Sequence, residues 1–176
     1  MNYRWLSCGI LFSLVFGSVL FSGCTGPLLS KTNYYESFYS SNAHTMYFVK
    51  PLKFESEQKE CKDALIDFTF KNDRADSVTV NMTVTGRLGT ELKSISFGNE
   101  SNSVELESVK LLFNEKEGDL YVFRYSGKCL VAEFFDLFSV NGQVKMIVNS
   151  DMSSFSFVAT KDAHKKIKDL LGVIVF

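Results

Sequence analysis

The sequence predicts a mainly β protein, either an antiparallel β-sandwich or a curled sheet of about seven to nine strands, with an amphipathic helix near the C-terminus. Apolar and polar residues alternate over several short segments, which indicates strands with one buried face and one solvated face. Polar or glycine-containing turns separate these segments. Seventeen phenylalanines and seven tyrosines among 176 residues supply the apolar bulk of a folded core and argue against disorder.

The clearest strand pair lies near the middle of the chain. Apolar and polar residues alternate strictly from Ile66 to Phe70 and again from Val78 to Val84. The six residues between these segments, Lys-Asn-Asp-Arg-Ala-Asp at 71–76, are polar and typical of a turn. Together the two segments predict an antiparallel hairpin with one face in the core.

Other segments with strand-like composition extend the predicted sheet. Pro51 is expected to end the first of them, and a change in the phase of alternation at Glu107-Ser108 indicates a β-bulge or a break. The expected strands lie at 45–49, 92–97, 104–113, 120–125, 144–148 and 155–157.

The segment 129–140 fits two structures. Its Leu130, Phe134, Leu137 and Phe138 suit a helix, but the run Phe-Phe-Asp-Leu-Phe also suits a buried strand. Short apolar runs flanked by glycine turns favour strands, so we expect a strand here. Asn141-Gly142 then predicts a hairpin turn into the next strand.

The period changes to that of a helix after the last predicted strand. Ala163, Ile167 and Leu170 recur at helical spacing, Thr160 suits the N-cap, and Gly172 suits the C-terminal end. We therefore expect an amphipathic helix, followed by a last strand or packed tail at 173–176.

That predicted helix also carries a group of cations, Lys165, Lys166 and Lys168. They are expected to form a solvated face, and the alternative is a patch that binds an anionic ligand or a lipid.

The N-terminus has the pattern of an export signal. Arg4 precedes an apolar run from Gly9 to Phe21, which is shorter than the roughly 20 apolar residues of a membrane-spanning helix. The small residues Ser22 and Gly23 then precede Cys24. Phe21-Ser22-Gly23-Cys24 resembles the lipobox of bacterial lipoproteins, with Phe21 where leucine is commonest. An ordinary cleaved signal peptide and an uncleaved membrane helix are the alternatives.

The lipoprotein resemblance implies a lipid anchor at Cys24. In such proteins this cysteine becomes the first mature residue and carries fatty acyl chains, such as palmitate, on its sulfur and amino group. The resemblance further implies a bacterial cell-envelope location, and Thr25 rather than Asp favours the outer membrane. The expected organisation is a signal peptide at 1–23, a tether and aromatic segment at 24–43, and a single β-rich domain at 44–176.

Two further features of the mature chain have open alternatives. Tyr34, Tyr35, Phe38 and Tyr39 have helical spacing, which suggests one or two helical turns. Their rings are expected to cap the open end of the core, and the alternative is a recognition surface or a membrane-facing aromatic patch. Cys61 and Cys129 form an even pair, which in an oxidising compartment predicts a disulfide. The alternative is two buried free thiols.

The sequence contains no recognisable catalytic, nucleotide-binding or metal-binding motif. Its only histidines, His44 and His164, are expected to be ordinary surface residues. A net charge of −1 does not indicate a nucleic-acid partner. We therefore expect a protein that is not an enzyme, with no cofactor or metal.

These exclusions leave two classes of function. The first is a lipid-anchored envelope protein that acts through protein contacts as an interaction or assembly subunit. It predicts an exposed apolar patch or an unprotected sheet edge. The second is a binding module for a small apolar or lipidic ligand, with phenylalanines around a cavity of several hundred Å³.

Overall fold

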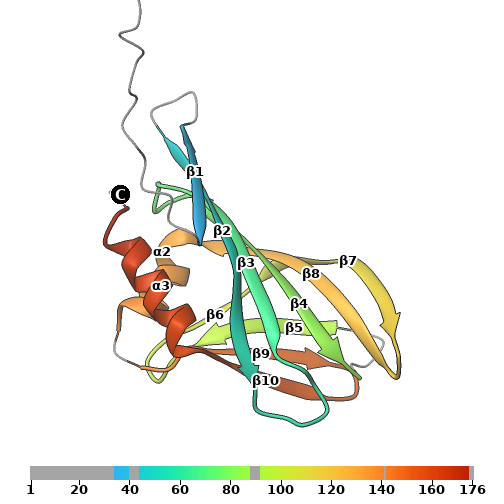
Figure 1. Cartoon of the computed structure of the whole chain (residues 1–176). Coiled ribbons are helices and arrows are strands. Elements are labelled where there is room, and N and C mark those ends of the chain that lie inside the picture. Colours follow the sequence, from blue (N-terminus) through green and yellow to red (C-terminus); the bar gives the residue numbers. More distant parts are fainter. Residues whose placement is uncertain (1–33, 40–43, 88–91, 141, 175–176) are drawn as a thin grey trace, which may run out of the picture. The chain divides into compact units, whose positions relative to one another are not determined.

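The computed structural model describes residues 34–39, 44–87, 92–140 and 142–174 (Figure 1). All described residues belong to one compact unit, Thr32–Phe176. The predicted signal peptide and Cys24 lie outside the described residues. Among those residues, no helix is both long enough and apolar enough to cross a membrane.

The described residues form ten strands and two helices. The strands are β1 (Tyr35–Tyr39), β2 (Thr45–Ser56), β3 (Ala64–Lys71), β4 (Ser77–Gly86), β5 (Leu92–Gly98), β6 (Ser103–Glu105), β7 (Glu107–Glu117), β8 (Leu120–Leu130), β9 (Lys145–Ser150) and β10 (Ser154–Ala159). The helices are α2 (Val131–Ser139) and α3 (Lys161–Leu171).

All ten strands belong to one antiparallel sheet in the order β6-β5-β9-β10-β2-β3-β4-β8-β7, with β1 paired to the first half of β2. The strands β6 and β7 lie at opposite ends of this order, yet only Leu106 separates them in the sequence. The two ends of the sheet must therefore meet at Leu106, and the sheet curls until it is nearly closed (Figure 1). The prediction of a mainly β, antiparallel, curled sheet is confirmed.

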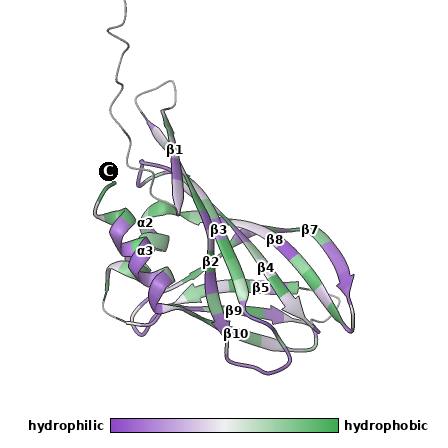
Figure 2. Cartoon of the chain, viewed as in Figure 1, coloured by the Kyte–Doolittle hydropathy of each residue, from purple (hydrophilic) through white to green (hydrophobic). Residues whose placement is uncertain are grey.

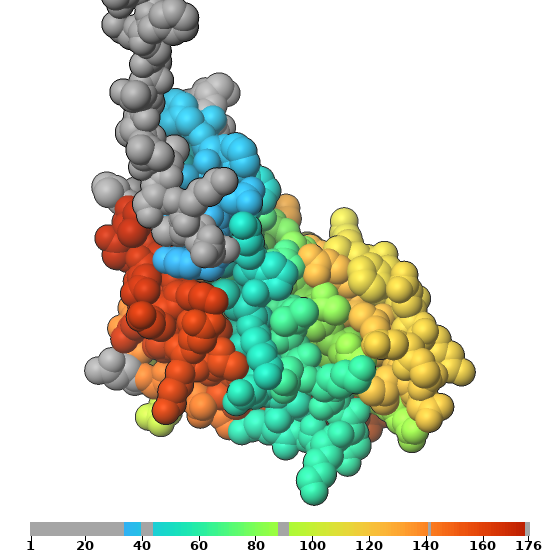
Figure 3. Space-filling model, viewed as in Figure 1, coloured from blue at the N-terminus to red at the C-terminus, as the bar shows by residue number. Residues whose placement is uncertain are grey.

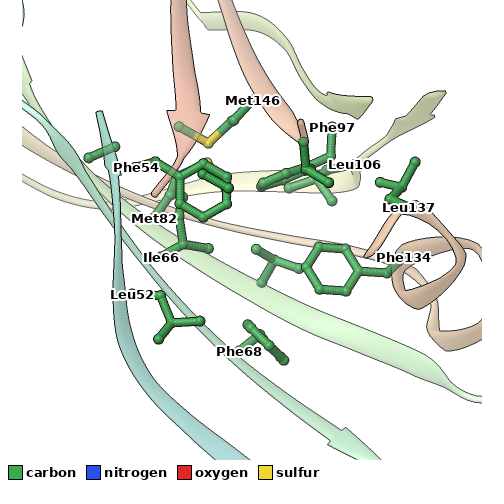
Figure 4. Close-up of a cluster of buried hydrophobic side chains, with 14 of the residues drawn as sticks. Leu52, Phe54, Ile66, Phe68, Met82, Phe97, Leu106, Phe134, Leu137 and Met146 are labelled. Atoms are coloured by element: carbon green, nitrogen blue, oxygen red, sulfur yellow. The ribbon is translucent and has the colours of Figure 1, made fainter. Parts of the chain in front are cut away.

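The core lies on the inner face of the curled sheet. Burial alternates without exception along β3 and β4, as the predicted hairpin requires. From α2, the Phe134 ring reaches the sheet, with its centroid 5.2 Å from that of Phe68 and 5.5 Å from that of Phe97 (Figure 4). Phenylalanine rings therefore fill the interior beside α2 rather than line a cavity there.

The strand expected at 129–140 is wrong over most of its length. Cys129 and Leu130 end β8, but the chain then forms α2, which buries Val131, Phe134 and Phe138 on one face. The helical spacing wins because a helix can place these side chains together over one end of the curled sheet. The segment after α2 leads to β9, so a hairpin turn between two strands is absent. Asn141 itself lies outside the described residues.

Two other expectations about N-terminal segments are also corrected. The segment with Tyr35 and Phe38 is a strand, not helical turns, because it pairs with β2 over five residues. Pro51 does not end β2, which continues to Ser56 with a shift in register between Val49 and Leu52. A proline is tolerated at such an irregularity because fewer ladder hydrogen bonds are made there.

The break expected near Glu107-Ser108 and the C-terminal helix are confirmed. Ser108 has a positive φ of 52° and lies where the β7–β8 register shifts. Thr160 caps α3 by accepting a hydrogen bond from the backbone N–H of Ala163 at 3.1 Å. After α3, Ile174 is buried as part of a packed tail, and residues 175–176 lie outside the described residues.

Candidate protein-interaction edge

The strand β7 is a long sheet edge with an exposed apolar middle. Within the described sheet it pairs only with β8, and ten of its eleven residues are exposed. Its middle carries three large apolar side chains, Leu111, Leu112 and Phe113, which are 52%, 53% and 39% exposed. Figure 2 shows the hydrophobic colour along part of β7, and Figure 3 shows the strand on the molecular surface. A strand edge of this kind offers unpaired backbone groups to another strand.

A β-bulge distributes these side chains over both faces of the edge. Leu111 lies opposite Tyr125, whereas Phe113 lies opposite Arg124, so Leu112 is the additional residue between them. Opposite residues in an antiparallel pair share a face. Leu111 therefore shares the inner face with the buried Tyr125, and Phe113 shares the outer face with Arg124.

A polar cluster fixes the outer face of the neighbouring strands. The Arg124 guanidinium donates hydrogen bonds to the Asp67 carboxylate at 2.6 Å and to the Thr83 hydroxyl at 2.8 Å. The Asn81 amide donates to the same Asp67 side chain at 2.8 Å. These bonds join β3, β4 and β8, so the edge strand β7 is supported by a rigid sheet.

A pocket of about 450 Å³ lies beside the inner face of β7. It is lined by Leu92 and Lys93 at the start of β5, by Val109 and Leu111 of β7, and by Tyr125 of β8. In the described sheet, β6 covers β5 only from Ser96 to Gly98. The start of β5 and the middle of β7 are thus two uncovered edges on either side of one pocket.

Aromatic rings extend this surface along the inner face of β8. The ring centroids of Tyr121 and Phe123 are 6.0 Å apart, and those of Phe123 and Tyr125 are 6.1 Å apart. Burial raises the pKa of the Tyr125 hydroxyl above its ordinary value, so this group stays neutral at physiological pH. Of these rings, Tyr125 lines the pocket and supplies a neutral hydrogen-bonding group there.

Cys61 and Cys129 do not form the predicted disulfide, and both are buried free thiols. Cys61 forms an isolated backbone β-bridge with Gly86, and Cys129 pairs with Val78. Val78 and Gly86 lie eight residues apart on β4. Eight strand residues span about 26 Å, whereas the Cα atoms of a disulfide lie within about 7 Å. Burial raises the pKa of each thiol to about 12, so neither is a nucleophile at neutral pH.

The two histidines lie apart from the β7 edge. His44 precedes β2, and His164 lies on α3 with its ring centroid 5.9 Å from that of Phe138. In the part of the chain that the structure describes, no group of three His, Cys, Asp or Glu side chains is placed to hold a metal ion.

Sequence reasoning did not identify β7 as an exposed edge. The alternation at Val109, Leu111 and Phe113 indicated a buried face, whereas Leu112 interrupts the alternation and is the local sign of a bulge.

Comparison with protein families, curated proteins and solved structures gives no match.

Proposed function

We propose that this protein is a lipid-anchored lipoprotein of the bacterial cell envelope, with Cys24 as the lipidated residue, and that its β domain is a non-catalytic interaction or assembly subunit. The observation that carries the interaction role is β7, an eleven-residue edge strand with three exposed apolar side chains. The lipobox-like Phe21-Ser22-Gly23-Cys24 supports the anchor, and the outer membrane is the proposed location.

The occupant that fits β7 is an extended segment of a partner protein, added as a further strand. In this mode backbone hydrogen bonds supply affinity, and pockets for alternate side chains supply specificity. The pocket between β5 and β7 would accept one apolar side chain, and Leu112 and Phe113 would contact others.

Charges beside the apolar segment indicate the composition of that partner strand. Glu107, Glu115 and Glu117 of β7 outnumber its Lys110 and Lys116. A partner strand with apolar residues at alternate positions and basic residues near its ends would complement this edge.

Natural proteins usually protect an exposed sheet edge from pairing with other chains by keeping the edge strand short or charged. The other end of the sheet follows this rule, because β6 has only three residues. The strand β7 has charged residues toward both ends and a bulge, but its length and apolar middle depart from the rule, as expected of an edge that a partner covers.

Site-specific photocrosslinking in intact cells would test the proposal. A photoreactive residue at Leu112 should give one dominant adduct, whereas the same residue at Leu65 should not. Leu65 is a matched control because it is a leucine of similar exposure, 45%, on the internal strand β3. Identification of the adduct by mass spectrometry should show the crosslink in an extended segment of the partner.

The proposal fails if Leu112 and Leu65 give the same adducts, or if neither gives one. The anchor is tested separately by labelling with a fatty-acid analogue. Wild-type protein should take up the label and a Cys24→Ala variant should not, so label retained in that variant would contradict lipidation at Cys24.

A further inference from the structure

A second pocket, of about 460 Å³, lies along α3 and the segment that follows α2. Gln143 and Ala159 line it from outside the helix, and Lys161, Lys165 and Lys168 line it from α3. Helical positions four and seven apart share a face, so these lysines form one row. The rise of the helix places the first and the last of them about 10 Å apart along its axis.

The pocket carries a positive charge at neutral pH. Asp169 is its single acidic lining residue, against the three lysines. His164 also lines the pocket, and its pKa is lowered, first by burial and then by the nearby charge of Lys168. His164 is thus neutral at pH 7, and the lysine ammonium groups supply the charge.

Two lysines of this row, Lys161 and Lys165, differ in their ion pairs from six other described lysines. Six described lysines, Lys50, Lys53, Lys62, Lys71, Lys145 and Lys166, lie within 4 Å of a carboxylate. Within the described ranges, neither Lys161 nor Lys165 has such an ion pair. Like charges on one helix face repel each other, and a bound anion would offset the part of this repulsion that Asp169 does not.

We propose that this pocket binds a phosphate group, carried either by an anionic phospholipid headgroup or by a soluble phosphate ester. Phosphate oxygens point in several directions and can accept hydrogen bonds from separate ammonium groups and from the Gln143 amide. The positive end of the α3 dipole lies at Lys161 and adds to the attraction. Ala159 and the His164 ring provide apolar surface for the carbon atoms next to the phosphate.

The binding site is independent of β7, and the full chain in neutral maltoside micelles can test it. The probes are inorganic phosphate in solution and phosphatidylglycerol mixed into the micelles, with phosphatidylcholine as the control lipid. The readout is the pKa of His164, measured by NMR of its ring carbons. The chain has only two histidines, so His44 is an internal reference.

Bound phosphate should raise the pKa of His164 in a saturable way, because a nearby negative charge favours the protonated ring. Lys161, Lys165, Lys168 and Asp169 are the charged groups that line the same pocket, and Phe138 is the α2 ring that contacts His164. The pKa of His44 should not change.

Lys165→Ala should weaken binding about tenfold, as expected for loss of one charge-assisted hydrogen bond. Lys166→Ala is the matched control, because Lys166 lies on the same helix but pairs with Asp162 at 2.7 Å and is absent from the pocket lining. Alanine favours helices, so both variants should fold.

A response to inorganic phosphate would assign a soluble phosphate ester, and a response to phosphatidylglycerol alone would assign a lipid headgroup. Either result supports the pocket. The proposal is overturned if neither probe shifts His164, if phosphatidylcholine acts as strongly as phosphatidylglycerol, or if Lys165→Ala and Lys166→Ala lose the same affinity.

Discussion

Along the direction of its strands the curled sheet has two open ends, and these ends differ in what covers their apolar side chains. At one end α2 covers the sheet, and Phe134 and Phe135 pack against Phe68 and Phe70. At the other end the β7–β8 hairpin extends, no described helix covers it, and Tyr121 is 40% exposed. The same residue types thus supply stability at the helix-covered end and surface for contact at the hairpin end.

The same substitution at each end should separate these roles most strongly. Phe134→Ala removes a ring that is 1% exposed and should lower the free energy of unfolding by about 3–5 kcal/mol. Phe113→Ala, at a ring that is 39% exposed, should lower it by less than about 1 kcal/mol. Urea unfolding followed by circular dichroism measures both. Equal losses would show that the hairpin end belongs to the folding core.

The closure of the sheet at Leu106, between β6 and β7, depends on a close contact at Gly127. A Cβ atom added there would lie 3.0 Å from both Cβ and Cδ1 of Leu106. Alanine normally suits a strand better than glycine, so the contacts with Leu106 and, at 3.3 Å, with Cγ2 of Val109 oppose the change. We expect Gly127→Ala to destabilise the fold by about 1–3 kcal/mol.

A double variant checks the cause of that loss. Leu106→Ala alone should destabilise by removing a buried side chain. Combined with Gly127→Ala it should cost less than the two single losses together, since alanine at position 106 removes Cδ1 from the contact and leaves only Cβ there. Strict additivity in urea unfolding would show that the contact with Cδ1 of Leu106 does not cause the loss in Gly127→Ala.

The buried thiols report on local opening at the two ends. Cys129 lies just before α2, and Cys61 bridges to Gly86, which pairs with Tyr121 near the β7–β8 turn. Both have a pKa of about 12, so labelling requires opening. We expect Cys61 to react about tenfold faster than Cys129, equivalent to about 1.4 kcal/mol.

Mass spectrometry after timed exposure to a thiol reagent distinguishes the two sites by peptide. Complete unfolding should remove the difference. Faster labelling of Cys129 would reverse the assignment of the more stable end.

The part of the fold that was predictable from the sequence is the part that local patterns determine. The β3–β4 hairpin follows from strict alternation on either side of a polar turn, and α3 follows from its period and the Thr160 cap. The segment 129–140 carried both patterns, and its packing against distant Phe68 and Phe97 decided between them. Local sequence does not contain that contact.

The candidate edge could not be located for a similar reason. The position of β7 at the edge depends on the order of all the strands, including pairs such as β5 with β9 that are distant in the chain. An exposed edge was expected in general terms, but no residue pattern placed it at Leu111–Phe113. The lysine row was visible in part, but Gln143 and Ala159 became its neighbours only through folding.

The substitution Leu112→Lys should have the smallest effect on stability, and it is the most informative about the role of β7. Leu112→Lys replaces a leucine that is 53% exposed at a bulge, so the free energy of unfolding should change by no more than about 0.5 kcal/mol. A lysine on an edge strand nevertheless opposes pairing with another strand, because its charge must be desolvated. Urea unfolding should therefore remain as in wild type, while a photoreactive residue at Leu111 should lose its crosslinked partner. Leu65→Lys, on the internal strand β3, should leave both measurements unchanged. If Leu112→Lys unfolded the domain, the apolar residues of β7 would be required by the fold; if it kept the crosslink, the partner would contact another surface.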